Sequence, residues 1–285
     1  MKLPEIAVNL LVFNTVSLDD ALDAVGKTDS RLVELAYTSG YAVFDEASAF
    51  TKEASDGIRE ALEIRGLRCR SIAAHMDLGM EDSIDRFRQR LLFAHRVGAT
   101  IVISNTSTID RRLRFEHNII ELSHIASDLG MTIGLENPGD GSGNLLSNGV
   151  AGAKLISSLG LANVGLNYDF SNAISYAGMK LDIELDCASA VEKSVNLHLK
   201  DLKSQESGLG WDFCPIGEGD HDYVVLFKHV KKHGVPIPMS LELPLHMQRG
   251  PDLLMKPRTH LLDREECIEA IQQSIQNINR LWETV

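Results

Sequence analysis

The sequence predicts a (β/α)8 barrel, on three observations. Short apolar runs alternate from end to end with segments whose apolar residues recur at three- and four-residue spacing. Glycine repeatedly stands between a helical pattern and the strand that follows it. The 285 residues also divide into about 36 residues per strand–helix unit, which is close to what eight such units require.

The predicted strands are apolar runs of the length expected for buried parallel strands. They cover Ile6–Phe13, Leu32–Ala36, Cys69–His75, Thr100–Ser104, Thr132–Glu136, Val164–Asp169, Val195–Lys200 and Pro238–Leu243. No linker or low-complexity segment divides the chain, so residues 1–285 are expected to form a single domain. A doubly wound open sheet is the alternative, but no GxGxxG turn follows the first strand.

The helical segments carry recognisable ends. One apolar pattern runs from Ile84 to Ala94 and stops at Gly98, while another is opened by Asp263 with Glu266 three residues later, which is a capping box. Glycine after a helix supplies the left-handed conformation of a C-cap. The glycines in this position are Gly66, Gly98, Gly130, Gly160 and Gly234.

Composition and charge exclude several classes of protein. Hydrophobic residues make up 44% of the chain and charged residues 24%, as in ordinary globular proteins. The formal net charge is −12 and no run of Lys and Arg forms a basic patch, which argues against nucleic acid and anionic membranes as partners. No apolar stretch is long enough to span a membrane. The four cysteines are scattered, so we expect a reducing, cytoplasmic location.

Ionisable side chains stand at the ends of four successive predicted strands. Glu136, Asp169, His198 and Glu242 are separated by 33, 29 and 44 residues, each interval being one strand–helix unit. Barrel strands end at one rim, where function is located, so these side chains should converge there. Three buried carboxylates would repel one another without a cation. The set therefore predicts one divalent metal, with Mn²⁺ preferred and Mg²⁺ or Co²⁺ as alternatives.

Short motifs around these residues carry a family resemblance. They read Val33-Glu34-Leu35, Leu135-Glu136-Asn137, Asn167-Tyr168-Asp169, Leu197-His198-Leu199-Lys200-Asp201, Ile216-Gly217-Glu218-Gly219 and Leu241-Glu242-Leu243. In order and spacing they resemble the sugar phosphate isomerase/epimerase superfamily, the xylose isomerase-like TIM barrels or AP endonuclease family 2. The resemblance implies a metal held by the four strand-end residues, and it implies that Glu136 and Glu242 act as acid and base.

The chain also departs from relatives within that superfamily. Asn105 and Asn172 stand where the DNA-cutting members place histidines for further metals, so ligands for one metal remain. The free-ketose epimerases also carry a histidine at position 172 and an arginine after the seventh-strand motif, where Leu202-Lys203-Ser204 stands here. The metal chemistry is therefore expected to persist while the substrate differs.

Three further residues are candidates for substrate contacts. His75, at the end of the third strand, is either a site residue or a structural one. Lys200 either neutralises an enediolate or pairs with Asp201, and the pairing is favoured. A long connection at about 244–262 contains Arg249, the preferred substrate contact in a predicted lid. The same connection could instead form a subunit contact in a homo-oligomer.

These residues favour a metal-dependent isomerase or epimerase of a sugar or keto-sugar. Proton transfer would pass through an enediolate at the metal, with two glutamates as acid and base. A metal-dependent dehydratase of an inosose-type keto-polyol is the first alternative, and a non-catalytic sugar-binding barrel is the second. The expected partner is a small sugar or polyol.

Overall fold

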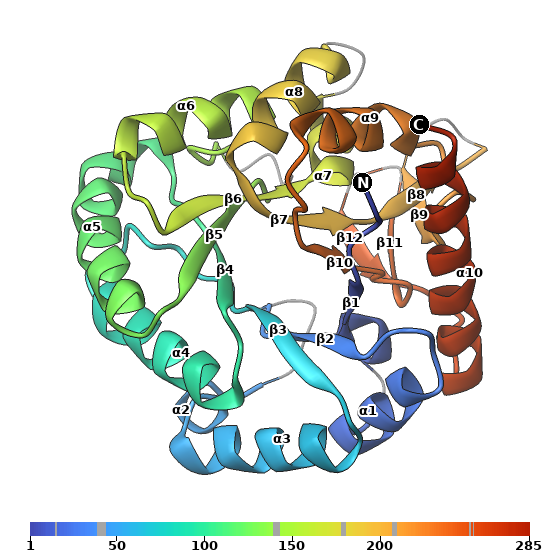
Figure 1. Cartoon of the computed structure of the whole chain (residues 1–285), viewed down its shortest axis with the longest axis horizontal. Helices are drawn as coiled ribbons and strands as arrows, with labels where there is room; N and C mark the ends of the chain where they lie inside the picture. The colour runs from blue at the N-terminus through green and yellow to red at the C-terminus, as the bar shows by residue number, and fades with distance from the viewer. Residues whose placement is uncertain are drawn as a thin grey trace.

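A computed structural model describes residues 1–14, 16–38, 44–138, 143–177, 181–206, 210–250, 252 and 254–285. Eight parallel strands close into a barrel in the order β1-β10-β7-β6-β5-β4-β3-β2, and helices surround it (Figure 1). The barrel strands are β1 (Ile6–Asn9), β2 (Leu32–Ala36), β3 (Arg68–Ala73), β4 (Ile101–Asn105), β5 (Thr132–Glu136), β6 (Val164–Asp169), β7 (Ser194–Leu199) and β10 (Met239–Leu241). The predicted fold class is confirmed.

The helices connect successive strands on the outside of the barrel. They are α1 (Leu18–Gly26), α2 (Glu46–Ala49), α3 (Lys52–Ile64), α4 (Ser83–Val97), α5 (Arg112–Asp128), α6 (Gly149–Leu159), α7 (Phe170–Ala177), α8 (Ile183–Lys193), α9 (Tyr223–His233) and α10 (Arg264–Glu283), with short 3₁₀ turns η1 (Leu10–Phe13) and η2 (Ile109–Arg111). The five predicted C-cap glycines all have positive φ, and the capping box of Asp263 and Glu266 is present. No described helix is both long and apolar enough to cross a membrane.

The first predicted strand is wrong in its second half. Only Ile6–Asn9 pairs with its neighbours, and Leu10–Phe13 forms the 3₁₀ turn η1. The side chain of Asn9 accepts a hydrogen bond from the backbone N–H of Leu11 at 2.9 Å, and this cap turns the chain out of the strand. An apolar run has the same composition in both conformations, so the pattern could not show where the strand ended.

A second, antiparallel sheet is built from segments that the sequence assigned to loops. Its order is β12-β11-β9-β8, with β8 (Asp201–Ser204), β9 (Trp211–Cys214), β11 (Met247–Arg249) and β12 (Met255–Pro257). The predicted long connection at 244–262 thus carries two short strands, although residues 251 and 253 lie outside the described part. The sheet follows β7 and β10, which places it at the rim where the carboxyl ends of the barrel strands lie.

The barrel interior is polar along one side of several strands. Because side chains alternate across a strand, residues two apart point to the same face. On β7 this parity groups Asn196 and His198 with Lys200, which follows the strand, and it separates them from the fully buried Leu197 and Leu199. The leucines belong to the hydrophobic core. Alternation therefore directs the polar residues inward, toward one another.

Candidate metal centre

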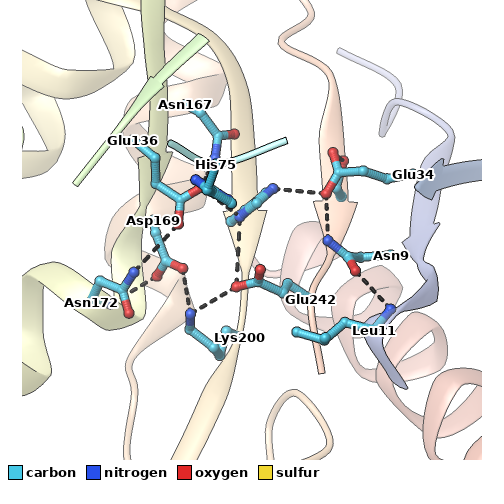
Figure 2. Close-up of polar contacts among 12 residues, drawn as sticks. Asn9, Leu11, Glu34, His75, Glu136, Asn167, Asp169, Asn172, Lys200 and Glu242 are labelled. Carbon is cyan, nitrogen blue, oxygen red and sulfur yellow. Dashed lines mark hydrogen bonds and ion pairs between the residues drawn. The ribbon is translucent and has the colours of Figure 1, made fainter. Parts of the chain in front are cut away.

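The four predicted ligands lie together at the rim of the barrel. Glu136 and Asp169 end β5 and β6, His198 is in β7, and Glu242 follows β10, so they come from four adjacent strands. One potential ligand atom from each lies within 4.8 Å of the others, and all four residues are buried. Figure 2 shows the carboxylates of Glu136, Asp169 and Glu242 directed toward a common point. The sequence-based expectation of convergence is thus met in the structure.

Lys200 supplies a positive charge next to this cluster. Its Nζ lies 2.7 Å from Asp169 Oδ2 and 2.8 Å from Glu242 Oε2. Figure 2 marks both contacts with dashed lines. Asp201, the partner favoured from the sequence, has both carboxylate oxygens occupied by backbone N–H groups, including those of Gly217 and Gly219. The favoured Lys200–Asp201 pairing is therefore replaced by contacts with two of the predicted ligands.

The ionisation of the cluster reflects burial opposed by neighbouring charges. Burial raises the pKa of Asp169, Lys200 lowers it, and the carboxylates of Glu136 and Glu242 raise it, which leaves it at about 6. Burial also raises the pKa of Glu242, but Lys200 and His198 outweigh this and hold it well below its usual value. A single lysine therefore does not compensate all of the carboxylates equally.

The donor atoms fit a divalent cation. Among the described residues, the buried atoms His198 Nδ1 and Asp169 Oδ2 have no aligned hydrogen-bond partner, although Nδ1 lies 3.1 Å from Glu136 Oε2 and Oδ2 lies 2.7 Å from Lys200 Nζ. His198 Nε2 lies 2.8 Å from Glu34 Oε1, and a carboxylate can only accept, so Nε2 carries the proton of that hydrogen bond and Nδ1 is the nitrogen that would give its lone pair to a metal. Three carboxylates and one imidazole are ligands that Mn²⁺, Mg²⁺ and related ions accept.

Two residues of the cluster, Glu136 and Glu242, line a cavity of about 180 Å³ together with Lys200. Its walls include residues of the second sheet, such as Trp211 and Arg249, which pair across β9 and β11. The Arg249 guanidinium lies 5.5 Å from the centroid of the Trp211 ring. The predicted substrate contact Arg249 therefore lines the same cavity as Glu136 and Glu242.

The remaining predicted residues also border this cavity. His75 Nε2 lies 3.6 Å from Glu136 Oε2, and both residues line the cavity with Lys200. Asn172 donates its backbone N–H to Asp169 Oδ1 at 2.8 Å and its side-chain amide to Glu136 Oε1 at 3.5 Å. In this protein the asparagine thus supports two predicted ligands through hydrogen bonds.

The loop that carries Gly217 and Gly219 depends on glycine. A Cβ at Gly219 would overlap the carboxylate of Asp201, and Gly217 has φ +84°, a conformation that favours glycine. The intervening Glu218 is exposed. Asp201 thus anchors this loop beside Lys200, one residue away in the chain.

Sequence reasoning missed a layer of polar residues beneath the cluster. Glu34 stands in one of the family motifs with no role predicted for it, yet it is fully buried and bonded to His198. Asn167 donates to Glu136 Oε2 at 2.6 Å. Asn167 pairs with Glu136 and stands two residues before Asp169, so the alternation of side chains along a strand was a signal for it in the sequence. Glu34 pairs with Asn9 and Ser71 and has no such relation to a predicted ligand.

Solved structures of other proteins share the fold of this chain. Solved structures similar to this chain include L-ribulose 3-epimerase, at 16% identity and a TM-score of 0.69 over 98% of this chain and 94% of that one. The IOLI protein with a bound zinc atom has 16% identity and a TM-score of 0.74 over 99% of both chains. The probable 3-DHS dehydratase AsbF from Bacillus anthracis has 14% identity and a TM-score of 0.69 over 96% and 99%.

At these identities the structural likeness concerns the fold. The chain has no significant sequence match among curated proteins. The family model described as xylose isomerase-like TIM barrel, by contrast, matches residues 23–280, which is most of the chain. The closed parallel barrel and this match together give one conclusion: the chain belongs to the xylose isomerase-like TIM barrel family.

Proposed function

We propose that this protein is a divalent-metal-dependent isomerase or epimerase of a sugar or keto-sugar. The observation that carries the proposal is the position of Glu136 and Glu242. They come from β5 and the end of β10, on either side of Asp169 and His198, and both line the same cavity. Two carboxylates facing one bound polyol are what proton removal and return at a carbon require.

The metal would be held by Glu136, Asp169, His198 and Glu242, with Mn²⁺ preferred on the oxygen-rich donor set. When bound, a divalent ion supplies Lewis-acid polarisation of a carbonyl oxygen, which makes the neighbouring C–H more acidic. One glutamate takes that proton and the other returns it. Return to the opposite face of the same carbon gives an epimer, whereas return to the adjacent carbon gives an aldose–ketose isomer.

The other cavity residues are assigned supporting roles. Lys200 Nζ, close to both Asp169 and Glu242, would balance the negative charge that develops on the sugar oxygens. His75 and Arg249 border the cavity and are proposed to hydrogen-bond hydroxyl groups of the substrate. Trp211 offers an apolar ring face to the sugar.

The proposal is tested by proton exchange in deuterated water. Ketoses and inososes are incubated with the metal-loaded protein, and loss of the C–H signal beside the carbonyl is followed by ¹H NMR. Glu136→Gln should lower the exchange rate by about 10²–10⁴-fold because the amide cannot take the proton. Exposed Glu218 provides the control, and Glu218→Gln should keep the wild-type rate. Full exchange in Glu136→Gln would refute the assignment.

A dehydratase is the second candidate, favoured by the position of Lys200. Loss of water needs a proton donor for the departing hydroxyl, and Lys200 lines the cavity with its Nζ 2.8 Å from Glu242 Oε2. The structural likeness to a probable dehydratase is consistent with this chemistry. Mass spectrometry of the products separates the two, since a dehydratase removes one water and an epimerase leaves the mass unchanged. A non-catalytic sugar-binding barrel would bind without either change.

A further inference from the structure

Glu34 is a carboxylate that the proposed reaction does not use. It lies in β2 with no exposed surface, on the far side of the cluster from Asp169 in Figure 2. A buried charge is costly unless hydrogen bonds satisfy it. The hydrogen bonds around Glu34 therefore have to compensate the cost of burying its charge.

Every acceptor position of Glu34 is filled by a donor from a different strand. Oε1 accepts from Asn9 Nδ2 at 2.7 Å and from His198 Nε2 at 2.8 Å. Oε2 accepts from Ser71 Oγ at 2.5 Å and from Ser240 Oγ at 2.7 Å. These partners lie on β1, β7, β3 and β10. The carboxylate is thus fixed in place by four donors, of which one belongs to a proposed metal ligand.

The same polar layer continues to Glu136. Ser240 Oγ accepts from Asn196 Nδ2 at 3.3 Å, and Asn196 also donates to Asn167 Oδ1 at 2.8 Å. Asn167 in turn donates to Glu136 Oε2 at 2.6 Å. Along this row of hydrogen bonds, each donor points toward one of the two carboxylates at its ends, Glu34 or Glu136. His198 lies between those carboxylates, with Nε2 toward Glu34 and Nδ1 toward Glu136.

We propose that Glu34 is a positioning residue of the metal centre, which holds His198 in the tautomer that presents the Nδ1 lone pair to the metal. An imidazole has one N–H and one lone pair, so accepting the Nε2 proton decides which nitrogen can be a ligand. The hydrogen bond also fixes the ring orientation and raises its basicity as a ligand. This inference rests on the proposed metal site, and it adds to that site the residue that orients the imidazole.

The first test uses the wild-type protein loaded with zinc, a diamagnetic ion. Histidine side chains are labelled with ¹⁵N, and the ring signals of His198 are assigned by their loss in His198→Gln. We expect a protonated Nε2 whose hydrogen exchanges slowly, and an Nδ1 shift typical of metal coordination. A proton on Nδ1, or an unprotonated Nε2, would overturn the proposal without any need for a variant at Glu34.

The second test measures zinc affinity by titration calorimetry. Glu34→Met removes the acceptor at similar size, and the zinc dissociation constant should rise by about 10–100-fold. Glu34→Gln keeps an oxygen that can accept from Nε2 and should restore part of the affinity. Asp186→Asn is the matched control, since Asp186 is a fully buried carboxylate that accepts from Tyr168 Oη and the N–H groups of Gly149 and Val150.

The outcomes separate this role from the proposed function. Zinc affinity within threefold of wild type in Glu34→Met refutes the positioning role, as does an equal loss in Asp186→Asn. If the wild-type protein binds no divalent ion, the proposed metal centre is refuted, and the positioning role of Glu34 is refuted with it. Zinc binding that weakens as expected, with no turnover of any ketose, leaves the positioning role standing and refutes only the proposed reaction.

Discussion

Removing the Lys200 ammonium should destabilise the metal-free protein and should do so much less when metal is bound. In the described structure, Lys200 Nζ lies 2.7 Å from Asp169 and 2.8 Å from Glu242, and its side chain is only 9% exposed. Lys200→Met keeps the apolar stem but leaves buried carboxylates without that cation. Breaking a buried pair in this way costs about 3–5 kcal/mol.

The loss of stability in Lys200→Met can be measured as a shift of the melting temperature. A chain of this size shifts by about 2 °C per kcal/mol, so Lys200→Met should melt roughly 6–10 °C below wild type in excess EDTA. A bound divalent ion supplies the missing positive charge, so saturating Mn²⁺ should narrow this gap to a few degrees. Differential scanning calorimetry measures both conditions.

Neighbouring Lys203 provides the control, because it is exposed on β8. Lys203→Met should change the melting temperature by no more than about 1 °C, as surface substitutions do. Equal stability of Lys200→Met and wild type in EDTA would contradict the electrostatic reasoning. A deficit of the same size with and without metal would show that Lys200 acts through packing alone.

Three further outcomes follow from the same structure. Chelation should lower the wild-type melting temperature by about 8 °C, since a ligand at 1,000 times its Kd contributes about 4 kcal/mol, and calorimetry with and without EDTA measures this. Burial lowers the pKa of His221 to about 4, so its unfolded form binds a proton first as pH falls below 6.5. About 2 kcal/mol of stability should then be lost between pH 7 and pH 5, and urea titrations of wild type and His221→Asn should show a smaller loss in the variant. Gly219→Ala places a Cβ against Asp201 and should cost about 1–3 kcal/mol, whereas Gly57→Ala, where a Cβ meets nothing within 4 Å, should be no less stable than wild type in the same titrations.

The sequence was sufficient for the helix ends because they depend on local chemistry. A glycine with positive φ closes α4 at Gly98, and Asp263 caps α10 with Glu266 three residues later. These groups bond to backbone atoms within one turn, so residue type and spacing are enough. The start of the chain shows the limit, since the turn at Leu10–Phe13 depends on one Asn9 side chain within an apolar run.

The second sheet could not be predicted, because its strands are short and pair across long intervals. Gln248 and Arg249 on β11 lie opposite Asp212 and Trp211 on β9. Strands of three or four residues carry little periodicity, and pairing partners are set by where the barrel places the chain. The part of the cavity wall that this sheet forms could therefore be identified only from the tertiary structure.

By itself the sequence determined the fold class and the four clustered side chains, because parallel strands of a closed barrel bring their carboxyl ends to one rim. Only the tertiary structure decided which charges meet there. Glu34 and His198 are 164 positions apart in the chain, and Lys200 faces Asp169 and Glu242 while its neighbour Asp201 accepts backbone N–H groups. Strand register and side-chain alternation set these contacts, and both depend on how distant strands pair.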